Sequence, residues 1–201
     1  MLRSPALIAL ILLVCAPHVA TAQDDAHPFE LGVQLPVVMS NEIDDTDVGV
    51  GGRVGWRPTS LFGVEAELNY VPGDAPRDGF SPGRTEGLFG MTVGPRLDRI
   101  RPFAKVRPGF VAFRGRSEPV ACILIFPPPL SCILAEGHTA LALDLGGGVE
   151  VFMTPRSFLR LDVSNRMVRY PGPAFDAGND THEDDFIGHE LRLAVGGGWR
   201  F

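Results

Sequence analysis

The chain has 201 residues, of which 45% are hydrophobic and 21% are charged, and its formal net charge is −6. This length suits a single domain. The acidic balance argues against a nucleic-acid partner, because nucleic acids are bound by clustered cations. Beyond the first 22 residues, no stretch offers the roughly 20 apolar residues that a transmembrane helix needs. Membrane insertion would therefore require a closed barrel.

Residues 1–22 have the pattern of a secretory signal peptide. Arg3 precedes a short apolar run, and Ala20-Thr21-Ala22 forms a small-x-small cleavage site. A lipoprotein would need small residues just ahead of Cys15, but Val14 stands there. We therefore expect residues 23–201 to form one mature domain, with a net charge of −7 after the loss of Arg3.

Eight later segments alternate between apolar and polar residues, which is the pattern of β-strands with one apolar face. They cover residues 29–39, 47–57, 61–71, 85–96, 101–113, 139–152, 158–170 and 186–201. The fifth is the least regular, because Phe103, Val111 and Phe113 fall on its polar side. Pro108 cannot donate to a strand ladder, so we expect a bulge there.

The connections between these segments alternate in length. Those after the second, fourth and sixth segments are short, and the others are mostly much longer, as in outer-membrane barrels with periplasmic turns and external loops. An aromatic girdle at the periplasmic ends is expected from Phe29, Trp56, Phe62, Trp199 and Phe201. A soluble lipocalin-type barrel shows the same alternation. The one-sided loops and clustered aromatic residues favour the membrane barrel.

The last segment, FIGHELRLAVGGGWRF, alternates up to the final Phe201. It resembles the closing strand of bacterial outer-membrane β-barrels. The stretches LALDLGGGVEVFMTPRSFLRLDV and RIRPFAKVRPGFVAF also resemble the small outer-membrane protein β-barrel domain family, which includes the OmpA transmembrane domain and OmpX-like proteins. The resemblance covers residues 29–201.

This resemblance implies an all-β fold, an eight-stranded antiparallel up-and-down transmembrane β-barrel in the outer membrane of a Gram-negative-type bacterium. It implies that Trp199 and Phe201 belong to an assembly signal. The implied partners are outer-membrane lipid and the barrel-assembly machinery, and a monomer is expected. The family has no shared catalytic residues or cofactor to carry over.

The polar faces of the strands predict a lumen filled with charge. An eight-stranded barrel is only just wide enough for side chains, so buried charges there must pair. We therefore expect a packed salt-bridge network rather than an ion pathway. Its assigned members are Glu65, Glu67, Lys105, Arg107, Asp144, Glu150, Arg160, Asp162, Arg166, Glu190 and Arg192. The same strand faces add Glu30, Glu86, Arg53, Arg57, Arg96 and Arg200 to the lumen.

Acidic residues crowd the first and last long loops. They are Glu42, Asp44, Asp45 and Asp47 in the first loop and Asp176, Asp180, Glu183, Asp184 and Asp185 in the last. With His182, they could offer the oxygen-rich ligands of a divalent-cation site. Their spacing does not match a calcium-binding loop. Solvated acidic loops are the favoured interpretation, and no metal site is predicted.

A lipid-A-modifying enzyme and a small pore are the alternative functions. Such an enzyme would need a nucleophile or base with a partner carboxylate near the outer leaflet. His189 and Glu190 are adjacent on a strand and therefore point to opposite faces. Glu65 and Glu67 share a face, but so do any two residues that are two positions apart on a strand. His138 lacks a serine two residues later, so the His-x-Ser arrangement associated with lipid-A deacylase barrels is missing. We predict a structural or surface-interaction role, without enzymatic activity or a cofactor.

The longest loop contains Cys122 and Cys132, which frame the run ILIFPPPLS. Beyond the inner membrane, thiols are oxidised, so we predict a disulfide between these cysteines. It would display an apolar knob made by Ile123, Leu124, Ile125, Phe126 and Leu130. The knob is either a docking site for an unidentified surface partner or, as favoured, a segment that folds back over the barrel mouth.

The predicted disulfide is tested by mass spectrometry of outer-membrane material alkylated without reduction. We expect the peptides that contain Cys122 and Cys132 to be linked, with a stabilisation of roughly 2–3 kcal/mol from the shortened loop. Two alkylated free thiols would contradict the disulfide.

Overall fold

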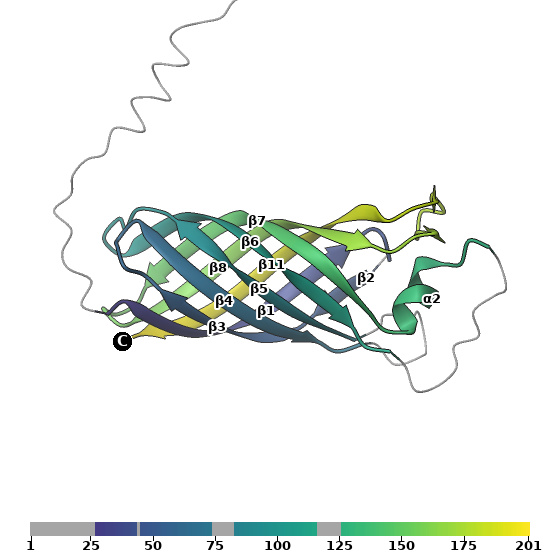
Figure 1. Ribbon diagram of the computed structural model, residues 1–201. Coiled ribbons are helices and arrows are strands. Elements are labelled where there is room, and N and C mark those ends of the chain that lie inside the picture. Colours follow the sequence, from purple (N-terminus) through teal and green to yellow (C-terminus); the bar gives the residue numbers. More distant parts are fainter. Residues whose placement is uncertain (1–26, 44, 74–82, 116–125) are drawn as a thin grey trace, which may run out of the picture.

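The structure is a computed structural model that describes residues 27–43, 45–73, 83–115 and 126–201. Most of the chain is in the long strands of one barrel, which Figure 1 shows from the side. These are β1 (Phe29–Ser40), β2 (Asp45–Val48), β3 (Val50–Trp56), β4 (Phe62–Val71), β5 (Arg84–Val93), β6 (Ile100–Phe113), β7 (His138–Phe152), β8 (Ser157–Tyr170) and β11 (Phe186–Arg200). The predicted signal peptide lies outside the described residues.

The barrel strands pair antiparallel with their neighbours in chain order, and β11 closes the sheet against β1 from Glu30↔Arg200 to Ser40↔Glu190. β2 and β3 form the predicted second strand, in one register along β1. They are separated at Gly49, whose N–H donates to the carbonyl of Pro36 at 2.8 Å. Pro36 cannot donate in return, so the ladder has a gap there. The eight-stranded up-and-down barrel is confirmed.

The predicted bulge at Pro108 is wrong. β6 keeps one register with β7 through Arg107↔Asp144, Pro108↔Leu143 and Gly109↔Ala142. Its register with β5 is also the same on both sides of Pro108. A strand residue directs its N–H to one neighbour only, so a proline removes a single ladder bond and needs no extra residue.

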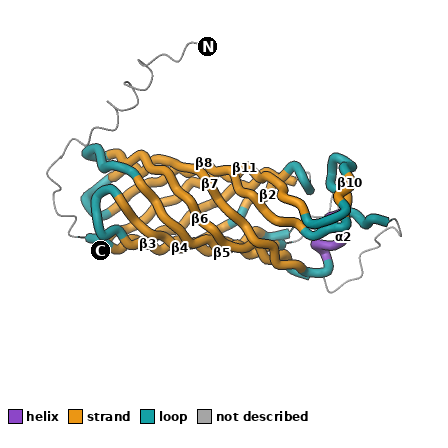
Figure 2. The backbone as a smooth tube through the Cα atoms, turned by 45° about the horizontal axis from the view of Figure 1, so that its top comes forward, coloured by secondary structure: helices purple, strands orange, loops and turns teal. Residues whose placement is uncertain are grey.

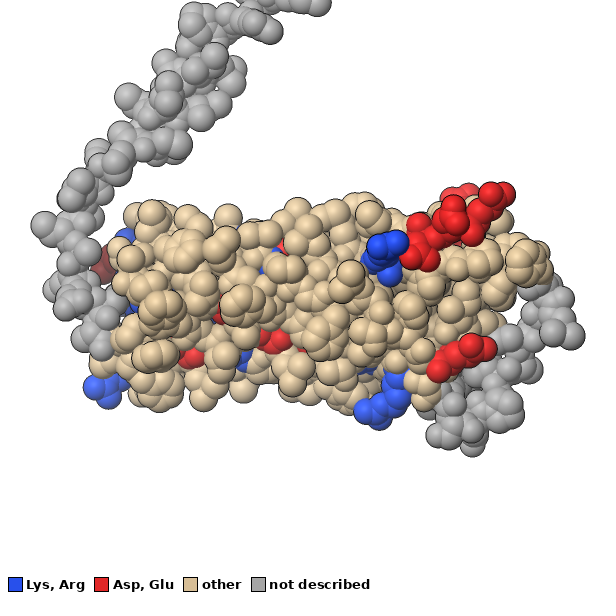
Figure 3. Space-filling model, in the orientation of Figure 1, with Lys and Arg blue, Asp and Glu red and all other residues tan. Residues whose placement is uncertain are grey.

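Side chains alternate between the lipid-facing and lumen-facing sides of the barrel wall. In β1, for example, Leu31, Val33 and Leu35 are exposed, whereas Glu30 and Gln34 are buried. On the face shown in Figure 3, the middle of the barrel carries mostly uncharged residues and the exposed charges gather near the ends. This apolar belt is the surface that a lipid bilayer covers. Among the described residues, no helix is long and apolar enough to cross a membrane.

The two ends of the barrel differ. The C-terminus and the short turns lie at one end, and the longer connections lie at the other (Figure 2). Phe29, Trp56, Trp199 and Phe201 are each about half exposed at the end with the short turns, and Phe29 is paired with Trp56 across β1 and β3. These four positions match the predicted periplasmic girdle, and Phe62, its fifth predicted member, is half-buried at the start of β4. The opposite, external end carries a short helix, α2 (Leu130–Ala135), and a small hairpin of β9 (Ala174–Phe175) and β10 (Thr181–His182).

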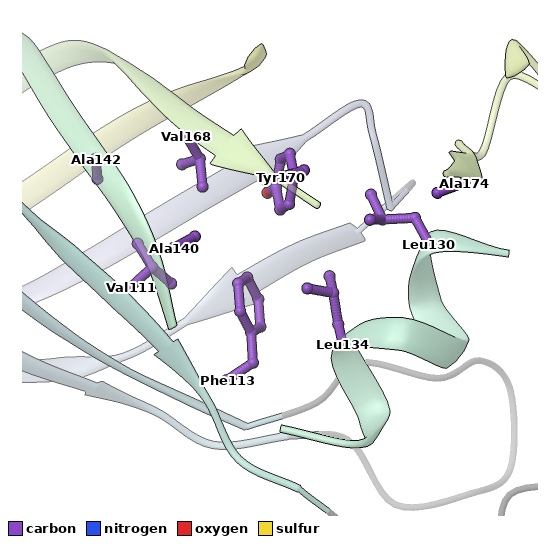
Figure 4. Close-up of a cluster of buried hydrophobic side chains, with 9 residues drawn as sticks. All are labelled: Val111, Phe113, Leu130, Leu134, Ala140, Ala142, Val168, Tyr170 and Ala174. Atoms are coloured by element: carbon purple, nitrogen blue, oxygen red, sulfur yellow. The ribbon is translucent and has the colours of Figure 1, made fainter. Parts of the chain in front are cut away.

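An apolar cluster lies at the external mouth of the barrel, where Figure 4 shows Leu130 and Leu134 of α2 on the same side as Tyr170 and Phe113. Leu130 and Leu134 of α2 are fully buried against side chains from the lumen faces of the strands. The cluster contains Val111, Phe113, Leu130, Leu134, Ala140, Ala142, Val168, Tyr170 and Ala174. It explains why Val111 and Phe113 fall on the polar side of the fifth segment, because both point into the mouth as members of this cluster. The helix α2, which contributes Leu130 and Leu134 to the cluster, is called the plug below.

The predicted apolar knob is therefore only partly exposed. Leu130, which was expected on its surface, is buried in the mouth, while Phe126 is 85% exposed. Cys132 lies within α2. Cys122 and the residues Ile123, Leu124 and Ile125 lie outside the described residues. The disulfide stays a prediction.

The closure of the barrel between β1 and β11 predicts the effect of changing Phe201. Its N–H donates to the carbonyl of Phe29 at 2.9 Å, which places the last residue of the chain at the point of closure. We expect deletion of Phe201, or Phe201→Asp, to lower the amount of heat-modifiable, folded protein in the outer membrane severalfold. Asp184→Asn, in the external loop, is the matched control. Unchanged abundance of the Phe201 variants would contradict the assembly role.

Candidate functional site

The lumen holds most of the charged side chains of the barrel wall. Within the described residues, ten cations and nine anions are buried and point inward. All eleven residues assigned to the predicted network are in this group, and each makes at least one ion pair. The lumen is thus filled by paired charges, arranged in three layers along the barrel axis.

The middle layer is organised around two arginines from different strands. Arg107, on β6, contacts Glu65 at 3.0 Å, Glu67 at 2.5 Å and Asp144 at 2.5 Å. Arg160, on β8, contacts Glu65 at 2.8 Å and Asp162 at 2.7 Å. Because Glu65 is shared, the two guanidinium groups form one network across the lumen.

The remaining members of the middle layer extend this network to further strands. Lys105 contacts Asp162 at 2.7 Å, and Arg192, on β11, pairs with Glu67. Glu67 also accepts a hydrogen bond from the amide of Asn69 at 2.7 Å. Charged side chains of one sign are thus surrounded by partners of the other sign, which offsets the cost of burying them.

The periplasmic layer joins Glu30 and Glu150 through arginines. Arg57 lies 2.7 Å from Glu30 and 3.1 Å from Glu150, and Arg101 contacts the same two carboxylates. Arg160 reaches Glu150 at 3.2 Å and links this layer to the middle one. The charge network therefore continues between the two layers.

Buried aromatic rings cover the periplasmic side of the network. Phe152 and Phe158 lie with ring centroids 6.0 Å apart. The guanidinium groups of Arg96, Arg101 and Arg200 lie over the Phe152 ring at 4.4–5.4 Å. These cation–π contacts join the aromatic pair to the charged layer.

The external layer lies beneath the apolar plug. Arg166 pairs with Glu86 at 2.7 Å and with Glu190, and Arg84 lies 3.1 Å from Asp47. The Tyr170 hydroxyl donates to Glu190 at 2.6 Å. Tyr170 also belongs to the apolar cluster, so its ring faces the plug while its hydroxyl faces the charges.

Four charged residues were assigned wrongly or left out by the sequence analysis. Arg96 does not lie on a lumen face but in the turn after β5, over Phe152. Arg84 is in the lumen although the sequence analysis left it in a loop, Asp47 is in the lumen although it was grouped with the acids of the first loop, and Arg101 was not counted. The alternation of residues along each strand could have placed Arg101 and Asp47 in the lumen. Arg101 shares its side of β6 with Lys105 and Arg107, and Asp47 continues the alternation that contains Arg53.

Three residues of the acidic loops lie together at the external rim. Potential ligand atoms of Glu42, Asp176 and His182 are all within 4.8 Å of one another. Asp180, Glu183, Asp184 and Asp185 are solvent-exposed. Asp44 lies outside the described residues. The sequence named these loops as candidates for a cation site, but it did not indicate which acids would meet.

The histidine and carboxylate considered for catalysis lie on opposite sides of the wall. Glu190 is fully buried in the lumen and paired with Arg166, whereas His189 is exposed and contacts Asn165 through Nδ1 at 3.0 Å. Glu65 and Glu67 are each held by arginines. None of these pairs forms a base with a free carboxylate partner.

The sequence matches the family described as outer membrane protein beta-barrel domain over residues 6–201. No curated protein matches the chain in sequence. The fold is similar to the N-terminal β-barrel domain of Pseudomonas aeruginosa OprF, with 12% identity, a TM-score of 0.48, and coverage of 86% of this chain and 97% of that one. The family match establishes that the chain belongs to the outer membrane protein beta-barrel domain family and resides in the outer membrane.

Two further solved barrels are similar at comparable levels. Ail, the attachment invasion locus protein of Yersinia pestis, has 12% identity and a TM-score of 0.47, with coverage of 87% of this chain and 97% of that one. Neisserial surface protein A has 14% identity and a TM-score of 0.47, with coverage of 86% of this chain and 96% of that one. At these values no property of either protein is transferred to this chain.

The charge network predicts a large difference between buried and exposed pairs. Arg107→Ala leaves Glu65, Glu67 and Asp144 without a shared cation, and we expect it to lower the free energy of unfolding by about 3–5 kcal/mol. The control is Arg169→Ala, since Arg169 and Asp185 form an exposed pair at 3.1 Å. Its expected effect is about 0–1 kcal/mol. Urea unfolding of the protein refolded into lipid vesicles measures both values, and equal effects would contradict a packed network.

Proposed function

We propose that this outer-membrane barrel is a closed, non-conducting structural protein whose external loops form its contact surface. The observation that carries the proposal is the filling of the lumen by three layers of paired charges between two covered ends. Phe152 and Phe158 cover the periplasmic side, and Leu130 and Leu134 of α2 cover the external side. Its role is then to occupy and strengthen the membrane and to present its loops.

A small pore is the less favoured function. An ion would have to pass arginine and carboxylate groups that are bound to one another from the periplasmic layer to the middle layer. It would also have to displace α2 from the mouth. An open pathway therefore requires breaking buried ion pairs, each of which costs several kcal/mol when one partner is left alone.

The absence of enzymatic activity is part of the same proposal. A lipid-modifying enzyme needs a nucleophile or base that is free to act near the outer leaflet. His189 contacts Asn165, and the nearest strand carboxylate, Glu190, faces the other side of the wall. The lumen carboxylates are held by arginines and are separated from lipid by the barrel wall.

A binding partner would contact the external loops. Phe126 is 85% exposed beside the plug helix, which supports a contact surface in the longest loop. The Cys122–Cys132 segment as a docking site for an unidentified partner remains a proposal. Its inner part, Leu130, is used to close the mouth, so the available surface is smaller than the sequence indicated.

Single-channel recording in planar lipid bilayers tests the closed barrel. We expect no steady open conductance from the purified protein. The variant Leu134→Ala removes apolar contacts of α2 without altering the charge layers, and we expect it to show no steady conductance either. A stable conductance of the unaltered protein would support the pore, and conductance only in Leu134→Ala would show that the plug rather than the charge network closes the lumen.

A further inference from the structure

The external rim brings together an imidazole and two carboxylates from separate parts of the chain. Glu42 lies in the connection between β1 and β2, and Asp176 and His182 lie in the long connection between β8 and β11. One ligand atom from each lies within 4.8 Å of the other two, and His182 Nε2 is 3.2 Å from Asp176 Oδ2. The two loops are also joined by the N–H of Ala177, which donates to the carbonyl of Glu42 at 2.9 Å.

Two of the three side chains, those of Asp176 and His182, are held in position by their surroundings. The N–H of Asp180 donates to Asp176 Oδ1 at 3.0 Å, which leaves Oδ2 directed at His182. The His182 ring is stacked on Phe186, with centroids 3.7 Å apart and planes 9° from parallel. Such contacts fix the orientation of metal-binding side chains in proteins.

A glycine next to Glu42 leaves the room that this side chain occupies. A Cβ atom at Gly188 would lie 2.5 Å from Glu42 Cγ and 2.6 Å from Tyr170 Cε2. Position 188 is buried, so a larger residue there would require the Glu42 side chain and the Tyr170 ring to move. The packing of β11 therefore permits the approach of the two loops.

The electrostatics of the group favour a cation. Two carboxylates held this close repel each other when both are ionised, and a dication between them would remove the repulsion.

We propose that Glu42, Asp176 and His182 bind a divalent transition-metal ion of the Zn²⁺ class and thereby tie the first external loop to the last. One imidazole and two carboxylates are common ligands of Zn²⁺, and three protein ligands leave a fourth position for water. The Nε2–Oδ2 separation is already close to the roughly 3.3 Å between neighbouring ligands of a tetrahedral ion with bonds of 2.0–2.1 Å. Imidazole distinguishes this site from a purely oxygen-lined Ca²⁺ or Mg²⁺ site.

An adjacent cavity gives the ion access to solvent. Its volume is about 190 Å³, and Glu42 and Asp176 line it together with Ile43, Leu130 and Phe175. This space is large enough for several water molecules, one of which would complete the coordination. The ion would lie beside the plug helix, so its binding would stabilise the closed arrangement of the mouth.

The test is calorimetric titration of ZnCl₂ into untagged, refolded protein in detergent micelles at neutral pH. We expect one Zn²⁺ per barrel, and at least tenfold weaker binding in each of Glu42→Gln, Asp176→Asn and His182→Ala. The matched control is Glu183→Gln, which removes an exposed acid from the same loop and is expected to change the affinity less than twofold. Heat modifiability on gels verifies that each variant is folded.

Co²⁺ provides a second readout, because a tetrahedral site with one imidazole gives an intense visible absorption that loosely bound ions lack. We expect this absorption in the unaltered protein and in Glu183→Gln, and its loss in His182→Ala. The absence of saturable Zn²⁺ binding would overturn the proposal and leave His182 and Asp176 as a simple ion pair. Zn²⁺ binding of equal strength in His182→Ala and Asp176→Asn would overturn it as well, since the ion would then be held elsewhere.

Discussion

The pairing of buried charge is the constraint on which the barrel depends. The wall must be apolar toward lipid, so strict alternation sends the polar residues of each strand into a lumen only just wide enough for side chains. Ten cations and nine anions of the described residues meet there. An unpaired charge in this space costs free energy, whereas a charged side chain that pairs with several partners holds together the strands that carry them. Glu65, for example, ties β4 to Arg107 of β6 and to Arg160 of β8.

The same geometry accounts for the two ends of the barrel. Toward the periplasm, arginines of the network lie over the Phe152 ring, so the charges end against aromatic surface. Toward the exterior, Tyr170 joins the charges to the apolar mouth, where α2 supplies Leu130 and Leu134. The loops beyond the plug are then free to carry other features, such as the rim group of Glu42, Asp176 and His182. Structural function and surface function are therefore separated along the barrel axis.

Most of the barrel could be predicted because strand residues alternate with a period of two between a face toward lipid and a face toward the charged lumen. Strand number and the eleven assigned lumen charges follow from alternation, whereas strand order and the closing role of the last strand were implied by the resemblance to outer-membrane barrels. Alternation fails near strand ends, where Arg84 and Asp47 are in the lumen although their surroundings resemble loops, and where Arg96 has already left the strand. The plug helix had no periodic signal, because it has only six residues and its buried Leu130 and Leu134 pack against side chains from several strands. The meeting of Glu42 with Asp176 likewise depends on the closure of β11 against β1.

A double-mutant cycle on Lys105 and Asp162 tests the central claim most directly. Their charged groups lie 2.7 Å apart in the middle layer. If the lumen is stabilised by pairing, Lys105→Met and Asp162→Asn should each reduce the free energy of unfolding, and the double variant should recover more than about 1 kcal/mol of the summed loss. Strict additivity of the two losses in lipid vesicles would mean that these charges are solvated independently, and it would contradict a packed, paired lumen.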